Sequence, residues 1–120
     1  MMSREITLQT NMDKIYCGEL NAYYGSVLND HQREVLRLYY DCDMSLAEIA
    51  ELYGTSRQAV REGIARSTEK LRQYEEKLGL IKKVKSLSGR LEHIIKVIDN
   101  EEKAEIKSKL SALLKDIKEI

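Results

Sequence analysis

Residues 46–60 read LAEIAELYGTSRQAV, and this stretch decides how the chain folds. Ser45 precedes it. Ser45 and Glu48 have the spacing of a capping box, in which a serine oxygen and a glutamate satisfy the free backbone N–H groups of a helix start. Gly54 follows the apolar run, where a residue without a Cβ adopts the left-handed conformation of a helix end at little cost. Ser56 then offers the N-cap of a new helix. The stretch therefore predicts a helix-turn-helix.

Both predicted helices carry apolar residues that would meet in a shared core. Ala50 is small enough to let the two helices approach closely, and Gly54 makes the connection tight. An ordinary helix pair with a short turn is the alternative, but the Ser-Arg-Gln sequence at 56–58 favours the helix-turn-helix. The residues expected to face the shared core are Ile49, Leu52, Val60 and Ile64.

Apolar residues at three- and four-residue steps predict further helices around this motif. The first covers about 13–28. The next starts at an N-cap supplied by Asn29 or Asp30 and ends at 41–43, and the helix after the turn continues over 57–78. Four tyrosines on the apolar stripes are expected in the core with their hydroxyls near the surface: Tyr16, Tyr23, Tyr39 and Tyr53.

The remainder of the chain carries two apolar stripes with the same internal spacing, offset by nineteen residues. On one straight helix this offset would rotate the second stripe by roughly 100° from the first, so a helical hairpin explains the pattern better. Asp99 and Glu102 have the spacing of a capping box at the bend. The stripes consist of Leu87, Leu91, Ile94, Ile95 and Ile98, and of Ile106, Leu110, Leu113, Leu114 and Ile117.

Chain length and net charge limit the classes of protein to which the chain can belong. The 120 residues correspond to about one domain, and 20 basic and 20 acidic side chains leave no net charge. A polycation that coats nucleic acid is therefore excluded, and any nucleic-acid site must be local. The segment 1–12 is polar and lacks the apolar run of a signal peptide or a membrane span. We expect a cytoplasmic protein without membrane insertion.

The sequence offers no catalytic or metal-binding motif. Cys17 and Cys42 form neither a CxxC motif nor a zinc-binding cluster, so we expect them to be reduced and buried. His31 and His93 have no second ligand at helical spacing. There is also no Gly-rich phosphate loop and no Ser-His-Asp or Cys-His arrangement. We therefore expect a protein that is not an enzyme and that needs no metal or cofactor.

The first turns of the second helix of the motif are where a helix-turn-helix protein would meet DNA. From Ser56 to Arg72 five basic residues stand against two acidic ones, so positive charge is concentrated here. Arg57 and Arg61 suit guanine edges or phosphates, and Gln58 suits adenine. The alternative is a solvated helix face whose arginines pair with nearby glutamates. The predicted DNA-binding residues are Ser56, Arg57, Gln58, Arg61, Glu62 and Arg66.

These motifs carry a family resemblance. The sequence LNDHQREVLRLYY at 28–40, followed by SLAEIA at 45–50 and SRQAVR at 56–61, resembles region four of bacterial sigma factors. With YYG at 23–25 and YEEKLGL at 74–80, the pattern looks like the YlxM family. The resemblance implies a helix-turn-helix DNA-binding protein of bacteria, whose family is linked by gene neighbourhood to the signal recognition particle pathway.

The expected fold is all-α: a sigma region four-like helix-turn-helix bundle with a C-terminal helical hairpin. We expect a polar segment over 1–12, a helix-turn-helix domain over 13–79 and a helical extension over 80–120. The expected function is that of a DNA-binding regulator of transcription with duplex DNA as its partner. The alternative is a protein-interaction regulator that binds signal recognition particle components without DNA. The hairpin either folds back on its own chain or forms a homodimer, which would suit a two-fold DNA site.

Overall fold

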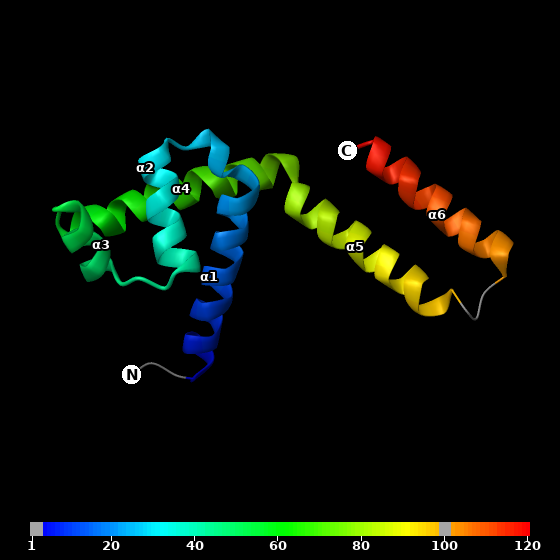
Figure 1. Cartoon of the computed structure of the whole chain (residues 1–120), viewed down its shortest axis with the longest axis horizontal. Coiled ribbons are helices and arrows are strands. Elements are labelled where there is room, and N and C mark those ends of the chain that lie inside the picture. Colours follow the sequence, from blue (N-terminus) through cyan, green and yellow to red (C-terminus); the bar gives the residue numbers. More distant parts are fainter. Residues whose placement is uncertain (1–3, 99–101) are drawn as a thin grey trace. The chain divides into compact units, whose positions relative to one another are not determined.

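The computed structural model describes residues 4–98 and 102–120, and all regular secondary structure in these ranges is helical (Figure 1). The chain divides into two compact units, the first ending at Gly79 and the second beginning at Leu80. The first unit contains α1 (Arg4–Tyr24), a 3-10 turn η1 (Gly25–Val27), α2 (Asp30–Leu36), a π-helical turn η2 (Arg37–Asp41), α3 (Leu46–Tyr53) and α4 (Arg57–Leu78). The second contains α5 (Leu80–Val97) and α6 (Lys103–Lys118). The predicted all-α fold is confirmed.

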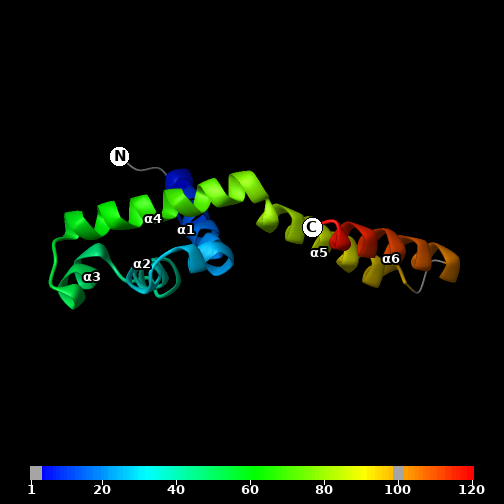
Figure 2. The ribbon, with the colours of Figure 1, turned by 90° about the horizontal axis from the view of Figure 1, so that it is seen from above.

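Helix α4 is the element that holds the first unit together. It runs across α1, α2 and α3 and packs against each of them (Figures 1 and 2). The four fully buried large side chains of the structure come one from each of these helices: Leu20, Leu36, Ile49 and Leu71. The core of the unit therefore lies between α4 and the three helices beneath it.

Three apolar residues predicted to face the core are instead exposed. Leu52 is 60% exposed and Tyr53 is 38% exposed, because α3 is short and buries only the side that carries Ile49 and Ala50. On α1 the buried residue of the tyrosine pair is Tyr24, whereas Tyr23 is exposed. The predictions for Leu52, Tyr23 and Tyr53 were wrong, while Tyr16 and Tyr39 are half-buried.

The bounds of α1 differ from the predicted range of about 13–28. The helix begins at Arg4, since 4–12 contains neither glycine nor proline and so nothing that breaks a helix. It ends at Tyr24 and passes through η1. Asn29 then caps α2: its side chain accepts from the backbone N–H of Gln32 at 2.8 Å, and the Gln32 side chain accepts from the backbone N–H of Asn29 at 3.1 Å. The predicted N-cap at this position is confirmed.

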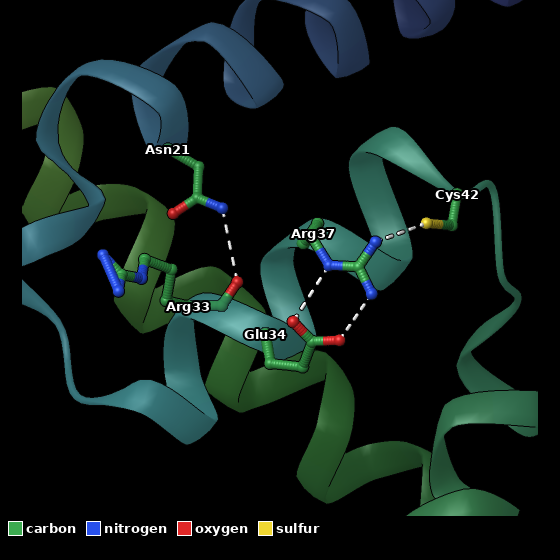
Figure 3. A network of polar contacts seen from close by, with 5 residues as sticks. All are labelled: Asn21, Arg33, Glu34, Arg37 and Cys42. Atoms are coloured by element: carbon green, nitrogen blue, oxygen red, sulfur yellow. Dashed lines mark hydrogen bonds and ion pairs between the residues drawn. The ribbon is translucent and has the colours of Figure 1, made fainter.

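A network of polar contacts fixes the passage from α2 into η2 (Figure 3). The Arg37 guanidinium donates to both carboxylate oxygens of Glu34, at 2.9 and 2.6 Å, and to Sγ of Cys42 at 3.2 Å. The hydrogen bond from Arg37 lowers the pKa of Glu34. Asn21 of α1 donates to the backbone carbonyl of Arg33 at 3.3 Å. Cys42 is exposed, so its predicted burial was wrong, whereas Cys17 is buried and both cysteines are free thiols.

Polar contacts also attach α4 to the elements beneath it. The hydroxyl of Tyr40 in η2 lies 2.9 Å from Oγ1 of Thr68. Burial raises the pKa of Tyr40 to about 12, so its hydroxyl stays protonated at neutral pH. The hydroxyl of Tyr24 donates to Glu75 at 2.5 Å. These contacts give the hydroxyls of Tyr24 and Tyr40 hydrogen-bond partners on α4.

The second unit is an antiparallel hairpin of α5 and α6, which lie side by side (Figure 1). Ile94 and Leu113 are buried, and Arg90 forms an ion pair with Asp116 across the two helices. The predicted hairpin is confirmed. The predicted capping box of Asp99 with Glu102 and the turn at Asp99 and Asn100 lie outside the described residues. In the described part of the chain, no helix has both the length and the apolar composition needed to span a membrane.

The burial of α3 gives a direct test of this core. We expect Ile49→Ala to lower the free energy of unfolding by about 2–5 kcal/mol, because it removes a fully buried side chain and leaves a cavity. Leu52→Ala removes a mostly exposed side chain and should cost less than about 1 kcal/mol. Urea denaturation of the full chain measures both. Equal losses for the two variants would contradict the observed orientation of α3.

Candidate nucleic-acid interface

The start of α3 is built as a reciprocal cap. The Ser45 hydroxyl oxygen accepts from the backbone N–H of Glu48 at 3.1 Å, and the Glu48 carboxylate accepts from the backbone N–H of Ser45 at 3.1 Å. The predicted capping box is therefore confirmed. It satisfies two of the N–H groups that a helix start leaves without intrahelical partners.

A short left-handed turn connects α3 to α4. Gly54 has φ 63° and ψ 40°, and the backbone N–H of Thr55 donates to the carbonyl of Ala50 at 3.0 Å. The hydroxyl of Ser56 then accepts from the backbone N–H of Ala59 at 3.0 Å and caps α4. Both predicted end signals are confirmed. The turn brings α4 back against α3, which gives the helix-turn-helix its shape.

Burial on α4 determines which of its side chains reach solvent. Val60 and Ile64 are buried one turn apart and pack with Ile49 and Ala50 of α3 in the core. All six predicted DNA-binding residues are exposed: Ser56, Arg57, Gln58, Arg61, Glu62 and Arg66. The structure thus leaves the first turns of α4 open to a ligand.

The six residues differ in whether their side chains already form hydrogen bonds within the chain. The Ser56 hydroxyl is used as the helix cap. Gln58 donates to Glu62 at 3.0 Å, so these two side chains bind each other across one turn. No ion pair or side-chain hydrogen bond joins Arg57 or Arg61 to any described residue. The Glu62 carboxylate thus accepts from the Gln58 amide and not from an arginine. This differs from the alternative of a solvated helix face whose arginines pair with nearby glutamates.

Arg66 lies apart from the other two arginines. Arg57 and Arg61 are one turn apart on the same side of α4, whereas Arg66 is rotated by roughly 140° from Arg61 at the helical repeat. Arg66 lines a cavity of about 410 Å³ between α2, α3 and α4. Lys70, one turn further along α4, donates to the carbonyl of Val27 at 3.4 Å. The unpaired arginine surface is therefore Arg57 and Arg61, with Arg66 on another flank.

The cavity contains a contact between two side chains that the sequence did not predict. His31 of α2 and Tyr53 of α3 meet edge to face, with ring centroids 4.7 Å apart, and both line the cavity. The two residues are far apart in the sequence and meet only because α2 and α3 pack on α4, so no local spacing could have indicated their contact. Among the described residues no group of three or more His, Cys, Asp or Glu side chains is placed to hold a metal ion.

Comparison with known proteins agrees with this architecture. Residues 11–115 match the model of the family UPF0122, described as "Putative helix-turn-helix protein, YlxM / p13 like". A UPF0122 protein of Desulforamulus reducens is 45% identical over 86 residues, covering 72% of this chain and 74% of the relative. One of Clostridium novyi is 41% identical over 106 residues, covering 88% and 92%. One of Thermoanaerobacter sp. strain X514 is 36% identical over 112 residues, covering 90% and 96%.

Substitutions at two glycines test whether the stability of the fold depends on the left-handed backbone conformation of Gly54. A Cβ at Gly54 would meet nothing within 4 Å, so Gly54→Ala changes only the backbone preference at φ 63°. We expect it to lower the free energy of unfolding by about 1–2 kcal/mol. Gly63 also has open space around its Cβ position but lies inside α4. Gly63→Ala should therefore raise the free energy of unfolding by about 0.5–1 kcal/mol.

Urea denaturation of the two variants beside the unaltered chain measures this contrast. Since both substitutions add one methyl group in open space, packing contributes equally little to either. Stabilisation by Gly54→Ala would contradict a left-handed turn between α3 and α4.

Proposed function

The chain belongs to the UPF0122 family of YlxM/p13-like helix-turn-helix proteins, and from that premise we propose that it is a regulatory protein that binds duplex DNA through the first turns of α4. The observation that carries the proposal is the pair Arg57 and Arg61. Both guanidinium groups are exposed and have no described partner, directly after a capped turn. In helix-turn-helix proteins these are the positions that reach base edges and phosphates in the major groove.

Electrostatics support a local interface instead of a general one. The chain has no net charge, so long-range attraction to DNA is weak and the free arginines must supply it. Each guanidinium can form two parallel hydrogen bonds with a phosphate or with a guanine edge. Because neither arginine has to leave an existing ion pair, binding does not pay a prior cost of breaking one.

The Gln58–Glu62 hydrogen bond bears on sequence reading. Gln58 suits adenine, but its amide donates to Glu62 and must release that contact to reach a base. Such an exposed hydrogen bond contributes only about 0.5–1.5 kcal/mol, so a base contact can replace it. The Glu62 carboxylate repels phosphates on the same face. We therefore propose a DNA contact in which the arginines supply affinity and Gln58 contributes to sequence preference.

We expect the variant Arg57→Ala plus Arg61→Ala to lose most of its DNA binding while it stays folded. Fluorescence anisotropy with a pool of random duplexes, repeated over a series of salt concentrations, measures this loss. Because each phosphate contact releases counterions, the slope of log K against log salt should become shallower by about two.

The matched control is Lys83→Ala plus Lys96→Ala, which removes the same charge from exposed positions of α5. It should leave affinity and salt slope close to those of the unaltered chain. If both double variants lost affinity to the same extent, binding would depend on total charge and the assignment to α4 would fail.

A second candidate function is a regulator that binds signal recognition particle components without DNA. The balance of 20 basic and 20 acidic residues favours this candidate, since protein partners do not require a basic surface. It predicts that the immobilised chain retains the particle protein after nuclease treatment, and that the arginine variant retains it equally. Loss of the particle protein on nuclease treatment would rule out this candidate.

A further inference from the structure

One side of the α5–α6 hairpin presents a continuous apolar surface to solvent. Its members, called here the hairpin face, are between 42% and 62% exposed. They are Leu91 and Ile95 of α5, Ile98 directly after its end, and Leu110, Leu114 and Ile117 of α6. Large aliphatic side chains with this degree of exposure are unusual when they recur along two neighbouring helices.

Helix geometry places all members of the hairpin face on the same side. Ile94 and Leu113 point between the helices, because they are the buried residues of the pair. At about 100° per residue, the exposed members on each helix are rotated from these positions in the same sense. Arg90 and Asp116, which form the ion pair between the helices, are rotated in the opposite sense. Because α5 and α6 are antiparallel, equal rotations bring both apolar stripes to one side and the ion pair to the other.

The hairpin face is large enough for a specific interface. Six half-exposed aliphatic side chains amount to roughly 500 Å² of apolar surface, near the upper end of what a monomer leaves in one patch. Two such faces pressed together with their flanking side chains would bury about 1,200 Å² in total, which reaches the range of stable protein interfaces.

The same face is complementary to itself in spacing. The stripe of α5 continues as Leu-x-x-Ile-Ile-x-x-Ile over 91–98, and that of α6 as Leu-x-x-Leu-Leu-x-x-Ile over 110–117. Side chains with identical intervals can interdigitate when one helix lies antiparallel on the other. By spacing alone, α5 of one copy therefore fits either α5 or α6 of a second copy.

Flanking charges favour one of the two pairings. Glu92 flanks the stripe on the outer side of α5, and Lys107 and Lys118 flank the stripe on the outer side of α6. All three of Glu92, Lys107 and Lys118 are exposed. Stacking α5 on a second α5 would bring the two Glu92 carboxylates to the same edge, whereas α5 on α6 brings opposite charges together.

From these observations we propose that two copies of the chain associate through the hairpin face, with α5 of each copy packed on α6 of the other. The product is a two-fold symmetric four-helix bundle in which the same surface serves both partners. Ile95 and Leu114, half-exposed in one chain, are buried at its centre. The proposal does not rest on DNA binding, although a dimer carries two copies of the α4 arginine pair.

Molecular mass in solution tests the proposal. Sedimentation equilibrium of the full chain should give twice the 13.9 kDa of one chain. The variant Ile95→Lys plus Leu114→Lys should raise the dissociation constant of the dimer at least about 100-fold, because two charges would be buried without partners. The control Ala104→Lys plus Ser108→Lys adds the same two charges at exposed residues of α6 outside the hairpin face and should stay dimeric.

A charge exchange keeps the test independent of folding defects. Glu92→Lys alone and Lys118→Glu alone should each weaken the dimer, and the two together should restore it, because the register set by Arg90 and Asp116 places Lys118 of one copy within about one turn of Glu92 of the other. Circular dichroism reports whether each variant keeps its helices. A single-chain mass for the unaltered protein at all concentrations would overturn the proposal, and so would a dimer that the double lysine variant leaves unchanged.

Discussion

The burial of one stripe of α4 is the constraint on which the first unit depends. Leu71 is fully buried, Val60 and Ile64 are nearly so, and α1, α2 and α3 all pack against this helix. Once that stripe faces inward, the rotation of α4 about its axis is set. Arg61 lies about 20° beyond the edge of that stripe, which Thr68 marks at about 100° per residue. Arg57 lies within the arc of the stripe and is exposed because it is the first residue of α4, ahead of its first buried residue, Val60. Core packing thus orients α4 and its candidate DNA-binding surface, and the turn at Gly54 determines where α4 begins.

Local signals in the sequence predicted the ends of the elements, because each depends on a few neighbouring residues. Ser45 with Glu48, Gly54 and Ser56 each have the role that their spacing indicates. Which apolar side chains are buried where the helices pack together could not be predicted from neighbouring residues. Tyr23 and Tyr24 are the same residue type at adjacent positions of α1, so their sequence does not show which one is buried. Packing against α4 buries Tyr24. Leu52 has the right period for burial, but α3 covers too little of the core to bury it.

The candidate site was predicted in part for the same reason. Its position on the first turns of α4 follows from the motif, and all six predicted residues are exposed there. Which of the six side chains already has a hydrogen-bond partner depends on contacts that only the folded chain makes. Glu62 accepts from Gln58 and leaves the arginines unpaired, a choice that spacing alone could not make because Glu62 lies four residues from both Gln58 and Arg66. The cavity beside Arg66 depends on three helices and has no sequence signature.

Chemical-shift mapping of the 15N-labelled chain during titration with a duplex tests the central claim most directly, namely that the first turns of α4 contact DNA. If the first turns of α4 contact DNA, the largest changes should fall on the backbone amides of 57–63, with weaker changes at the turn around Gly54. Saturation at a defined ratio of duplex to protein should accompany them. Changes confined to α5 and α6, or no changes in α4 at a salt concentration where binding is saturated, would show that α4 does not contact DNA.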